Sequence, residues 1–130
     1  MSMILDGTSG LTLPAAAAPA FSVYLSANQT VTTTVVTKVS LNTKTFDTNT
    51  NFDASTNYRF TPTVAGYYQF NASIYGGASG GSQTLQVVYF YKNGSLYSTG
   101  SVQSSTTNVC GSGSVLISMN ALPSFGVCEV

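Results

Sequence analysis

The sequence predicts an all-β protein, an antiparallel β-sandwich preceded by a short extended N-terminal arm. Thr, Val, Tyr and Phe, which favour strands, recur along the whole chain. Residues 66–74 alternate between the two faces of an extended chain, and an alternation with one apolar face indicates a half-buried strand. Asn93-Gly94 lies between two strand-like runs and is a strong hairpin signal.

The first predicted element is the arm, within residues 1–19. Asp6-Gly7 and Ser9-Gly10 are turn dipeptides between two short apolar runs, so the arm is expected to be a small hairpin or an extended segment. Pro14, four alanines and Pro19 then form a linker. This predicts two parts, an arm and linker at 1–19 and a single domain at 20–130.

The domain is expected to begin with a strand at Phe21 to Leu25. A long Thr/Val stretch at 28–40 follows, and its predicted inward residues are Val31, Val35, Val36 and Val39. The strand pattern continues from Leu41 to Phe46 and ends at a loop over 47–51. Next come the alternating strand from Gly66 and a Gly/Ser loop at 76–81.

The run at 85–91 is apolar on both faces. A sandwich strand buried on both sides needs a second partner on its outer face, and a subunit interface is the natural one. The candidate interface residues are Val88, Tyr89, Phe90 and Tyr91. After the Asn-Gly turn we expect a strand at 96–102, a polar loop at 106–113 and a last clear strand with Val115, Ile117 and Met119 on one face.

A family motif runs through residues 47–72. In order, it consists of Phe52-Asp53, Thr56-Asn57, Phe60-Thr61-Pro62 and Gly66-Tyr67-Tyr68-Gln69-Phe70. This order and spacing resembles the C1q-like domain, a trimeric jelly-roll module related to the tumour-necrosis-factor fold. The pieces at 20–23 and 92–94 also match in order, so the resemblance covers residues 20–121.

The resemblance implies an antiparallel jelly-roll sandwich that assembles as a homotrimer. It implies a core built on Phe52, Phe60, Gly66, Tyr68 and Phe70, and we expect Gly66 to occupy a position that a Cβ would strain. Thr56-Asn57 is expected to form a tight turn with Asn57 in the left-handed region. The family continues beyond the position of Ala121 with two more strands, whereas nine residues follow here, so the last strand or strands are predicted to be missing or degraded.

The arm resembles a short element, hydrophobic-Asp-Gly-Thr-x-Gly, that recurs in bacteriophage tail-fibre and other virion proteins. C1q-like domains also occur at the ends of phage fibres. Together the two resemblances predict a structural protein of a virion: a trimeric fibre tip, knob or surface decoration. Its partners would be another virion or fibre protein, bound through the arm, and a host-surface glycan or protein receptor. The alternative is a bacterial or secreted C1q-like module that binds a soluble ligand.

Residue chemistry favours a non-enzymatic role. The chain has no histidine, the commonest general base and metal ligand, and we expect no cofactor and no metal. Asp47 and Asp53 are the one candidate acid–base pair, but loop aspartates usually accept hydrogen bonds in turns. Cys110 and Cys128 are expected to be reduced and buried, with a bridge left open as the alternative.

Charge and hydropathy exclude further classes. Four Lys and Arg balance four Asp and Glu, so no basic cluster is present to neutralise nucleic-acid phosphates. No apolar run reaches membrane-spanning length, and the start carries no recognisable signal peptide, so we expect synthesis in a host cytoplasm. The tyrosines at 67, 75, 89, 91 and 97 fit either a sugar-stacking surface or, as we favour, a contact between protomers.

Overall fold

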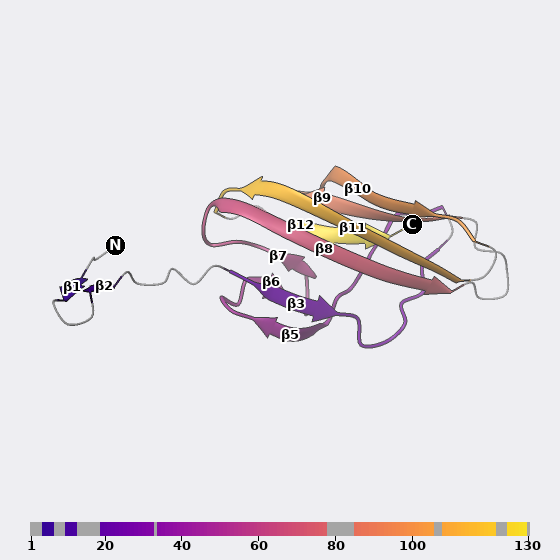
Figure 1. Ribbon diagram of the computed structural model, residues 1–130. Coiled ribbons are helices and arrows are strands. Elements are labelled where there is room, and N and C mark those ends of the chain that lie inside the picture. The colour runs from indigo at the N-terminus through magenta and orange to yellow at the C-terminus, as the bar shows by residue number, and fades with distance from the viewer. Residues whose placement is uncertain are drawn as a thin grey trace.

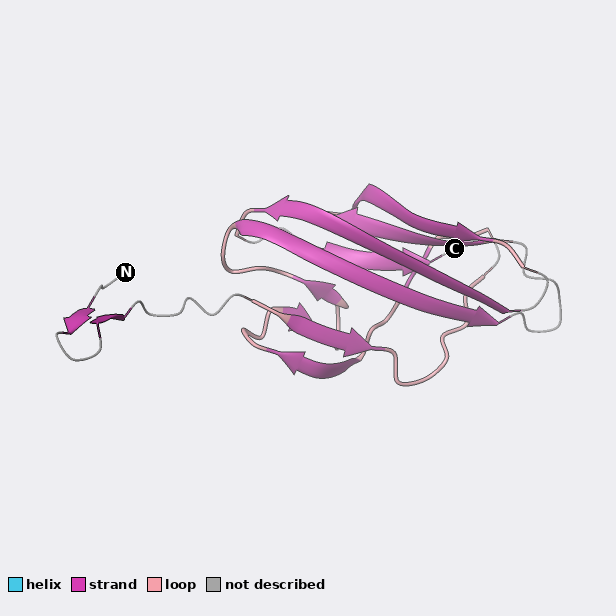
Figure 2. Cartoon of the chain, in the orientation of Figure 1, coloured by secondary structure: helices cyan, strands magenta, loops and turns pink. Residues whose placement is uncertain are grey.

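The computed structural model describes residues 4–6, 10–12, 19–32, 34–77, 85–105, 108–121 and 125–129. For 4–6, 10–12 and 127–129 it describes the backbone alone. Every regular element in these residues is a β-strand, and every pairing is antiparallel (Figure 2). The predicted all-β, antiparallel fold class is therefore confirmed.

The strands in chain order are β1 (Ile4–Asp6), β2 (Gly10–Thr12), β3 (Phe21–Tyr24), β4 (Thr37–Lys38), β5 (Thr43–Asp47), β6 (Phe52–Asp53), β7 (Arg59–Phe60), β8 (Gly66–Gly77), β9 (Gln86–Lys92), β10 (Ser95–Gln103), β11 (Asn108–Met119) and β12 (Phe125–Glu129). One sheet has the order β10-β9-β12-β7-β6, with β4 also paired to β12. β8 and β11 form a long ribbon, and β3 and β5 form a shorter one (Figure 1). The described strands thus give a β-sandwich-like arrangement.

The core lies between the large sheet and the β8–β11 ribbon. Phe70 of β8 stacks on Phe125 of β12, with ring centroids 3.8 Å apart. Phe125 in turn lies 5.8 Å from the Phe90 ring of β9. Three alternate residues at the end of β11, Val115, Ile117 and Met119, are buried in the same cluster. This face of β11 matches the predicted one, because a strand places alternate residues on one side.

The aromatic motif supplies the other end of the core. Phe52 and Phe60 are buried, and both stack on Phe21 of β3, at 5.1 and 4.8 Å between centroids. Tyr68 is half-buried, and its hydroxyl donates to the Val64 carbonyl at 2.6 Å. A polar tip that finds a partner at the surface allows the rest of the ring to pack inward.

Two expectations about motif geometry are wrong. Gly66 has no left-handed φ, and a Cβ there would meet only the Tyr68 ring at an ordinary 3.9 Å, so it is not a strained position. In the turn between β6 and β7, the left-handed residue is Tyr58, with φ of 46°, rather than Asn57. The turn geometry is set by the Asp53 carboxylate, as described below, and not by the local preference of Asn57.

In the described part of the Thr/Val stretch, 28–32 and 34–40, the only strand is the two-residue β4. Val39 is buried, but Val35 and Val36 are 52% and 47% exposed, so the prediction that both face inward is wrong. The side chain of Gln29 accepts from the Ser40 amide and donates to the Lys38 carbonyl, both at 2.8 Å. Side-chain hydrogen bonds therefore replace part of a strand ladder here, which β-propensity alone does not reveal.

The predicted polar loop at 106–113 is instead largely strand. β11 begins at Asn108 and pairs with β8 without interruption to Met119. Gly113 permits this, because a Cβ there would lie 2.7 Å from the Phe90 ring and 2.9 Å from the Gly100 Cα of β10. Ser112 also donates its amide to the Ser101 hydroxyl at 2.7 Å, so β10 and β11 approach closely.

The hairpin between β9 and β10 is confirmed. Lys92 pairs with Ser95, and the two loop residues Asn93 and Gly94 have φ of 53° and 79°. Two positive φ values in a two-residue loop match the primed turns that Asn-Gly favours. At the other end of the chain, β1 and β2 pair with each other and with no other described strand.

The last described strand, β12, is a central one. It pairs with β9 over Phe125–Glu129, with β4, and at Phe125 with Phe60 of β7.

The Gly/Ser loop predicted at 76–81 is partly strand. Residues 76 and 77 belong to β8, which extends to Gly77, and 78–81 lie outside the described residues.

Candidate functional site

The predicted subunit interface on β9 divides between its two faces. Val88 and Phe90 are fully enclosed in the core of their own chain, at 0% exposure. Tyr89 and Tyr91, on the opposite face, are half-buried. A side chain that its own chain already encloses has no surface to offer a neighbour, so Val88 and Phe90 leave the candidate interface. On the face of Tyr89 and Tyr91, Val87 is also buried within the chain, at 3% exposure, and both edges of β9 are paired, with β10 and β12.

The most exposed apolar side chains of the head lie together on another face. Tyr67, Tyr75 and Leu116 are 79%, 70% and 64% exposed, and all three belong to the β8–β11 ribbon. Tyr67 and Tyr75 are eight residues apart on one strand and on the same side of it, about 27 Å from one another. Leu116 is the direct cross-strand partner of Gln69 between them.

We call this surface the outer face. It comprises the exposed residues Tyr67, Gln69, Asn71, Ser73 and Tyr75 of β8 and Asn108, Cys110, Ser112, Ser114, Leu116 and Ser118 of β11. Each is hydroxyl, amide, thiol or apolar, and none carries a charge at neutral pH. Polar contacts already cross it, since Gln69 donates to the Ser114 hydroxyl at 3.4 Å.

This uncharged face bordered by tyrosines shares two features with protein interfaces. Charged side chains are depleted at the centre of such interfaces and Tyr is enriched there, whereas Ser, which occurs four times on this face, is depleted. Hydroxyl and amide groups exchange hydrogen bonds with water for bonds to a neighbour at low cost, whereas a buried unpaired charge would be expensive. The composition of this face is therefore compatible with binding an uncharged partner surface.

Sequence reasoning found the tyrosines of this face but missed its β11 half. The segment Cys110-Gly111-Ser112-Gly113 was predicted to be a loop because Gly and Ser usually mark turns. The signal was present, since Val109, Gly111, Gly113 and Val115 continue the inward alternation of Ile117 and Met119. Reading a glycine as a small inward residue recovers both the strand and the outer face.

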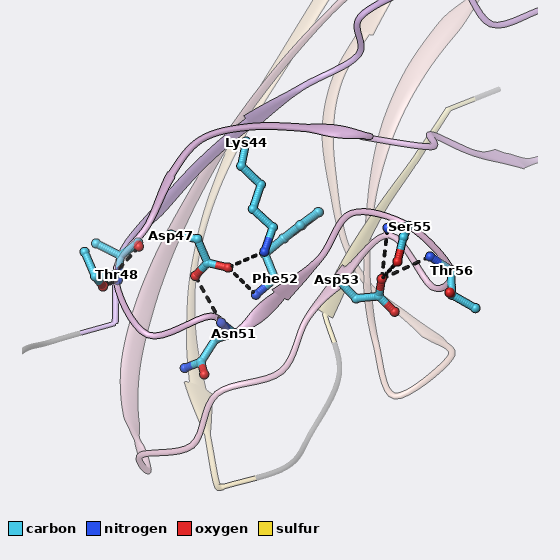
Figure 3. Close-up of polar contacts among 9 residues, drawn as sticks. Lys44, Asp47, Thr48, Asn51, Phe52, Asp53, Ser55 and Thr56 are labelled. Atoms are coloured by element: carbon cyan, nitrogen blue, oxygen red, sulfur yellow. Dashed lines mark hydrogen bonds and ion pairs between the residues drawn. The ribbon is translucent and has the colours of Figure 1, made fainter.

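The two loop aspartates form separate polar clusters (Figure 3). Asp47 ends β5 and accepts from the backbone amides of Asn51 and Phe52 at 3.0 and 3.1 Å. It also forms an ion pair with Lys44 at 2.8 Å, and its side chain is only 5% exposed. The carboxylate thus closes the loop between β5 and β6 and ties it to the start of the aromatic motif.

Asp53 closes the turn between β6 and β7. Its carboxylate accepts from the amides of Ser55, Thr56 and Asn57 at 2.9–3.0 Å and from the Asn57 side chain at 2.8 Å. The Ser55 hydroxyl adds a further bond at 3.1 Å. Both carboxyl oxygens are therefore committed to the turn, as the sequence predicted for a loop aspartate.

Both environments hold these acids in the ionised form. For Asp47, burial would raise the pKa, but the bonds from Lys44, Phe52 and Asn51 outweigh it and lower the pKa below its usual value. For Asp53, the bonds from the Thr56 and Ser55 amides and the Asn57 side chain lower the pKa strongly. A general acid at neutral pH needs a raised pKa, so the two groups are suited to structure rather than to proton transfer.

The same loops border a shallow, open hollow of about 650 Å³. Its lining consists mainly of hydroxyl and amide side chains and includes Asp53, whose carboxylate is already hydrogen-bonded in the turn. The lining residues are Asn42, Lys44, Thr50, Asn51, Phe52, Asp53, Ala54, Ser55, Thr61 and Thr63. No exposed aromatic ring lines it, so it lacks the stacking platform that sugar rings use.

Further features of the described residues concern metal ligation, the two cysteines and membrane-spanning helices. Among the described residues, no three Asp, Glu, Cys or His side chains gather as a metal site. Cys110 is a free thiol and is exposed, contrary to the expected burial, while the side chain of Cys128 lies outside the described part. No described stretch forms a helix with the length and apolarity needed to cross a membrane.

Comparison with known proteins gives no relative: no family model matches the chain, and neither does any curated protein.

Proposed function

We propose that this chain is a non-enzymatic structural protein of a virion, the C1q-like head of a trimeric fibre tip, knob or surface decoration. The observation that carries the proposal is the outer face of β8 and β11, a broad, exposed and uncharged surface on a head whose loop acids are committed to structure. The motif resemblance at 47–72 and the fibre-like arm support the same assignment.

The outer face would serve as the contact between subunits. In a closed three-fold ring, each subunit meets its neighbours through two different patches, and every copy buries the same surface. Burying Tyr67, Tyr75 and Leu116 would remove the largest exposed apolar groups of the head from water. The chain has only eight Lys, Arg, Asp and Glu residues, so exposed apolar groups would lower its solubility. Burying them in a subunit contact would avoid this.

The β5–β6 and β6–β7 loops would then remain outside, free to meet a receptor. Their side chains are Thr, Asn and Ser around the hollow, and their backbones are fixed by Asp47 and Asp53. A fixed loop loses little conformational entropy on binding, which favours recognition. Attachment to the particle would be the role of the arm.

The assembly is tested by light scattering of the purified full chain, where we expect three times the 13.5 kDa mass. Leu116→Asp should shift the mass to that of a monomer, because a charge would be buried unpaired in the contact. Leu96→Asp is the matched control: Leu96 is 54% exposed but lies on β10, away from the outer face, and it should leave the trimer intact.

Cys110 provides a second readout on the same face. In a Cys128→Ser background it is the only thiol of the chain. We expect slow maleimide labelling in the trimer and fast labelling in the Leu116→Asp variant. Equal rates in both, or a clean monomer mass for the native chain, would contradict the proposed contact.

The virion assignment is tested separately, by searching for the chain in purified virus particles. Particles from the culture that carries the gene should contain the protein by mass spectrometry, and gold-labelled antibody should mark a fibre end or the particle surface in electron micrographs. Its absence from intact particles would overturn the assignment and favour a soluble binding module.

A further inference from the structure

We propose that the free edge of β8 accepts an added strand from the N-terminal arm of a second copy of this chain. The inference rests on the proposed self-assembly and goes beyond it, because it joins copies through backbone pairing rather than through the outer face.

The edge itself is the first observation. β8 pairs with β11 along all twelve of its residues, and no described strand pairs with its opposite edge. In an antiparallel ladder, alternate residues direct their N–H and C=O groups to opposite edges, so about half of those in β8 point away from β11. An unpaired strand edge of this length is a template for another strand.

The side chains beside this edge are incompletely covered. Tyr68, Ala72 and Ile74 of β8 point to the core but are only half-buried, whereas Val88 and Phe90 of β9 are fully enclosed. Phe21 of β3 is also half-buried, although its ring lies 6.0 Å from that of Phe70. Among the described strands β3 pairs only with β5, so the contact between β3 and β8 is made by side chains and not by a ladder. An added strand with apolar alternate residues would complete this cover.

The described strands of the arm have no partner in the described head. β1 and β2 have three residues each and pair with no described strand of the head. A two-stranded hairpin on its own is at best marginally stable in water. In the β1–β2 hairpin, Leu5 is the cross-strand partner of Leu11, and Asp6 is the one charged residue of the two strands. Strand addition would supply the hairpin with a third strand and the β8 edge with its missing hydrogen bonds.

The linker allows the reach between copies. Eight residues separate Thr12 from Phe21, which in extended form span about 26 Å. Because the hairpin pairs with no strand of its own head, the second copy is the occupant that the pairing pattern favours.

Amide hydrogen exchange followed by NMR on the full chain tests the proposal. The β8 amides form two alternating sets, one bonded to β11 and one directed to the free edge. In the native protein we expect both sets to exchange slowly. The double variant Leu5→Thr/Leu11→Thr keeps residues that favour strands but removes the apolar pair, and it should release the edge set alone, by at least tenfold in rate. The set bonded to β11 reports that the head is still folded. Ala17→Thr, in the linker, is the control and should change neither set.

Dilution separates the possible partners. Protection of the edge set that falls with protein concentration supports a second copy. Edge amides that exchange freely in the native chain would overturn the proposal, as would protection that does not change on dilution, since that would mean the chain's own arm closes the edge. Light scattering is read on the same samples, so a trimer with an unprotected edge leaves the proposed function standing while this inference fails.

Discussion

Asp53 illustrates how a single carboxylate can determine backbone geometry. Three successive amides and one side-chain amide converge on it, and the chain after them enters the left-handed region at Tyr58. A bulky residue with positive φ is uncommon, and the surrounding contacts must hold it there. The turn between β6 and β7 is thus held by hydrogen bonds to one acid, and not by a residue that adopts the left-handed region easily.

This carboxylate predicts a pH-dependent stability difference. The pKa of Asp53 is lower in the folded chain than its ordinary 3.8, so its contribution is complete above that value and is lost as the pH falls through the folded pKa. Asp53→Ala should therefore lower the urea midpoint at neutral pH, and its deficit relative to the native protein should shrink on acidification below 3.8. Thr56→Ala retains the donating amide and should keep the native pH profile. A deficit for Asp53→Ala that is the same at both pH values would contradict the capping role.

The core predicts a contrast between two aromatic residues of β8. Phe70 is buried and stacked on Phe125, so Phe70→Ala should lower the free energy of unfolding by about 3–5 kcal/mol. Tyr67, three residues earlier and on the outer face, is 79% exposed in the single chain. Tyr67→Ala should cost the isolated subunit less than about 0.5 kcal/mol. Both are measured by urea unfolding in the Leu116→Asp background, in which we expect no assembly. A loss below about 1 kcal/mol for Phe70→Ala would refute the register of β8.

At the scale of elements, β11 depends on glycine. Gly113 lies against the Phe90 ring and against Gly100 of β10, so the backbones of β10 and β11 approach closely at this point. Close approach of two backbones is one of the uses of glycine within strands. The cost in strand propensity is offset by the enclosure of Phe90, which is the centre of the core.

Gly113→Ala should therefore destabilise the fold. The new Cβ would lie 2.7 Å from the Phe90 ring and 2.9 Å from a backbone atom, and overpacking of this kind costs about 1–3 kcal/mol. Gly66→Ala is the control, because its Cβ would meet an ordinary 3.9 Å contact. It should be neutral or slightly stabilising in thermal melts. Equal losses for the two variants would show that propensity, not the contact, dominates.

Strand alternation made much of the fold predictable from sequence, and tertiary context decided the rest. The runs at 66–74, 85–91 and 115–119 were foreseen because most of their inward residues are large and apolar. The first half of β11 was missed because its inward residues are glycines, whose role depends on Phe90 and Gly100 elsewhere in the chain. Val35 and Val36 were misplaced because the Gln29 side chain, distant in sequence from Ser40, fixes the local backbone. Val88 and Phe90 were expected at a subunit contact because apolarity in the sequence does not tell whether the same chain or a neighbour covers a side chain; here their own chain encloses both.

At the scale of the whole molecule, scarcity of charge is the dominant property. The outer face holds no ionised side chain, so its association should depend little on ionic strength. We expect the dissociation constant of the trimer to change by less than about threefold between roughly 0.1 and 1 M NaCl, although screening lengths shrink from about 10 to 3 Å over that range. Analytical ultracentrifugation at several salt concentrations measures this. Dissociation at high salt would point to an interface containing the few Lys and Asp residues instead.

The alternation in β8 and β11 also separates the selective pressures on adjacent residues. Phe70, Val115 and Ile117 are tied to the packing of the interior, so few substitutions leave the fold intact. Their immediate neighbours Asn71, Ser114 and Ser118 stand on the opposite side, exposed and outside the core. Substitutions at these exposed positions should therefore cost little folding stability. Evolution can change the chemistry of that surface, and with it the binding partner, one residue at a time while the core stays the same.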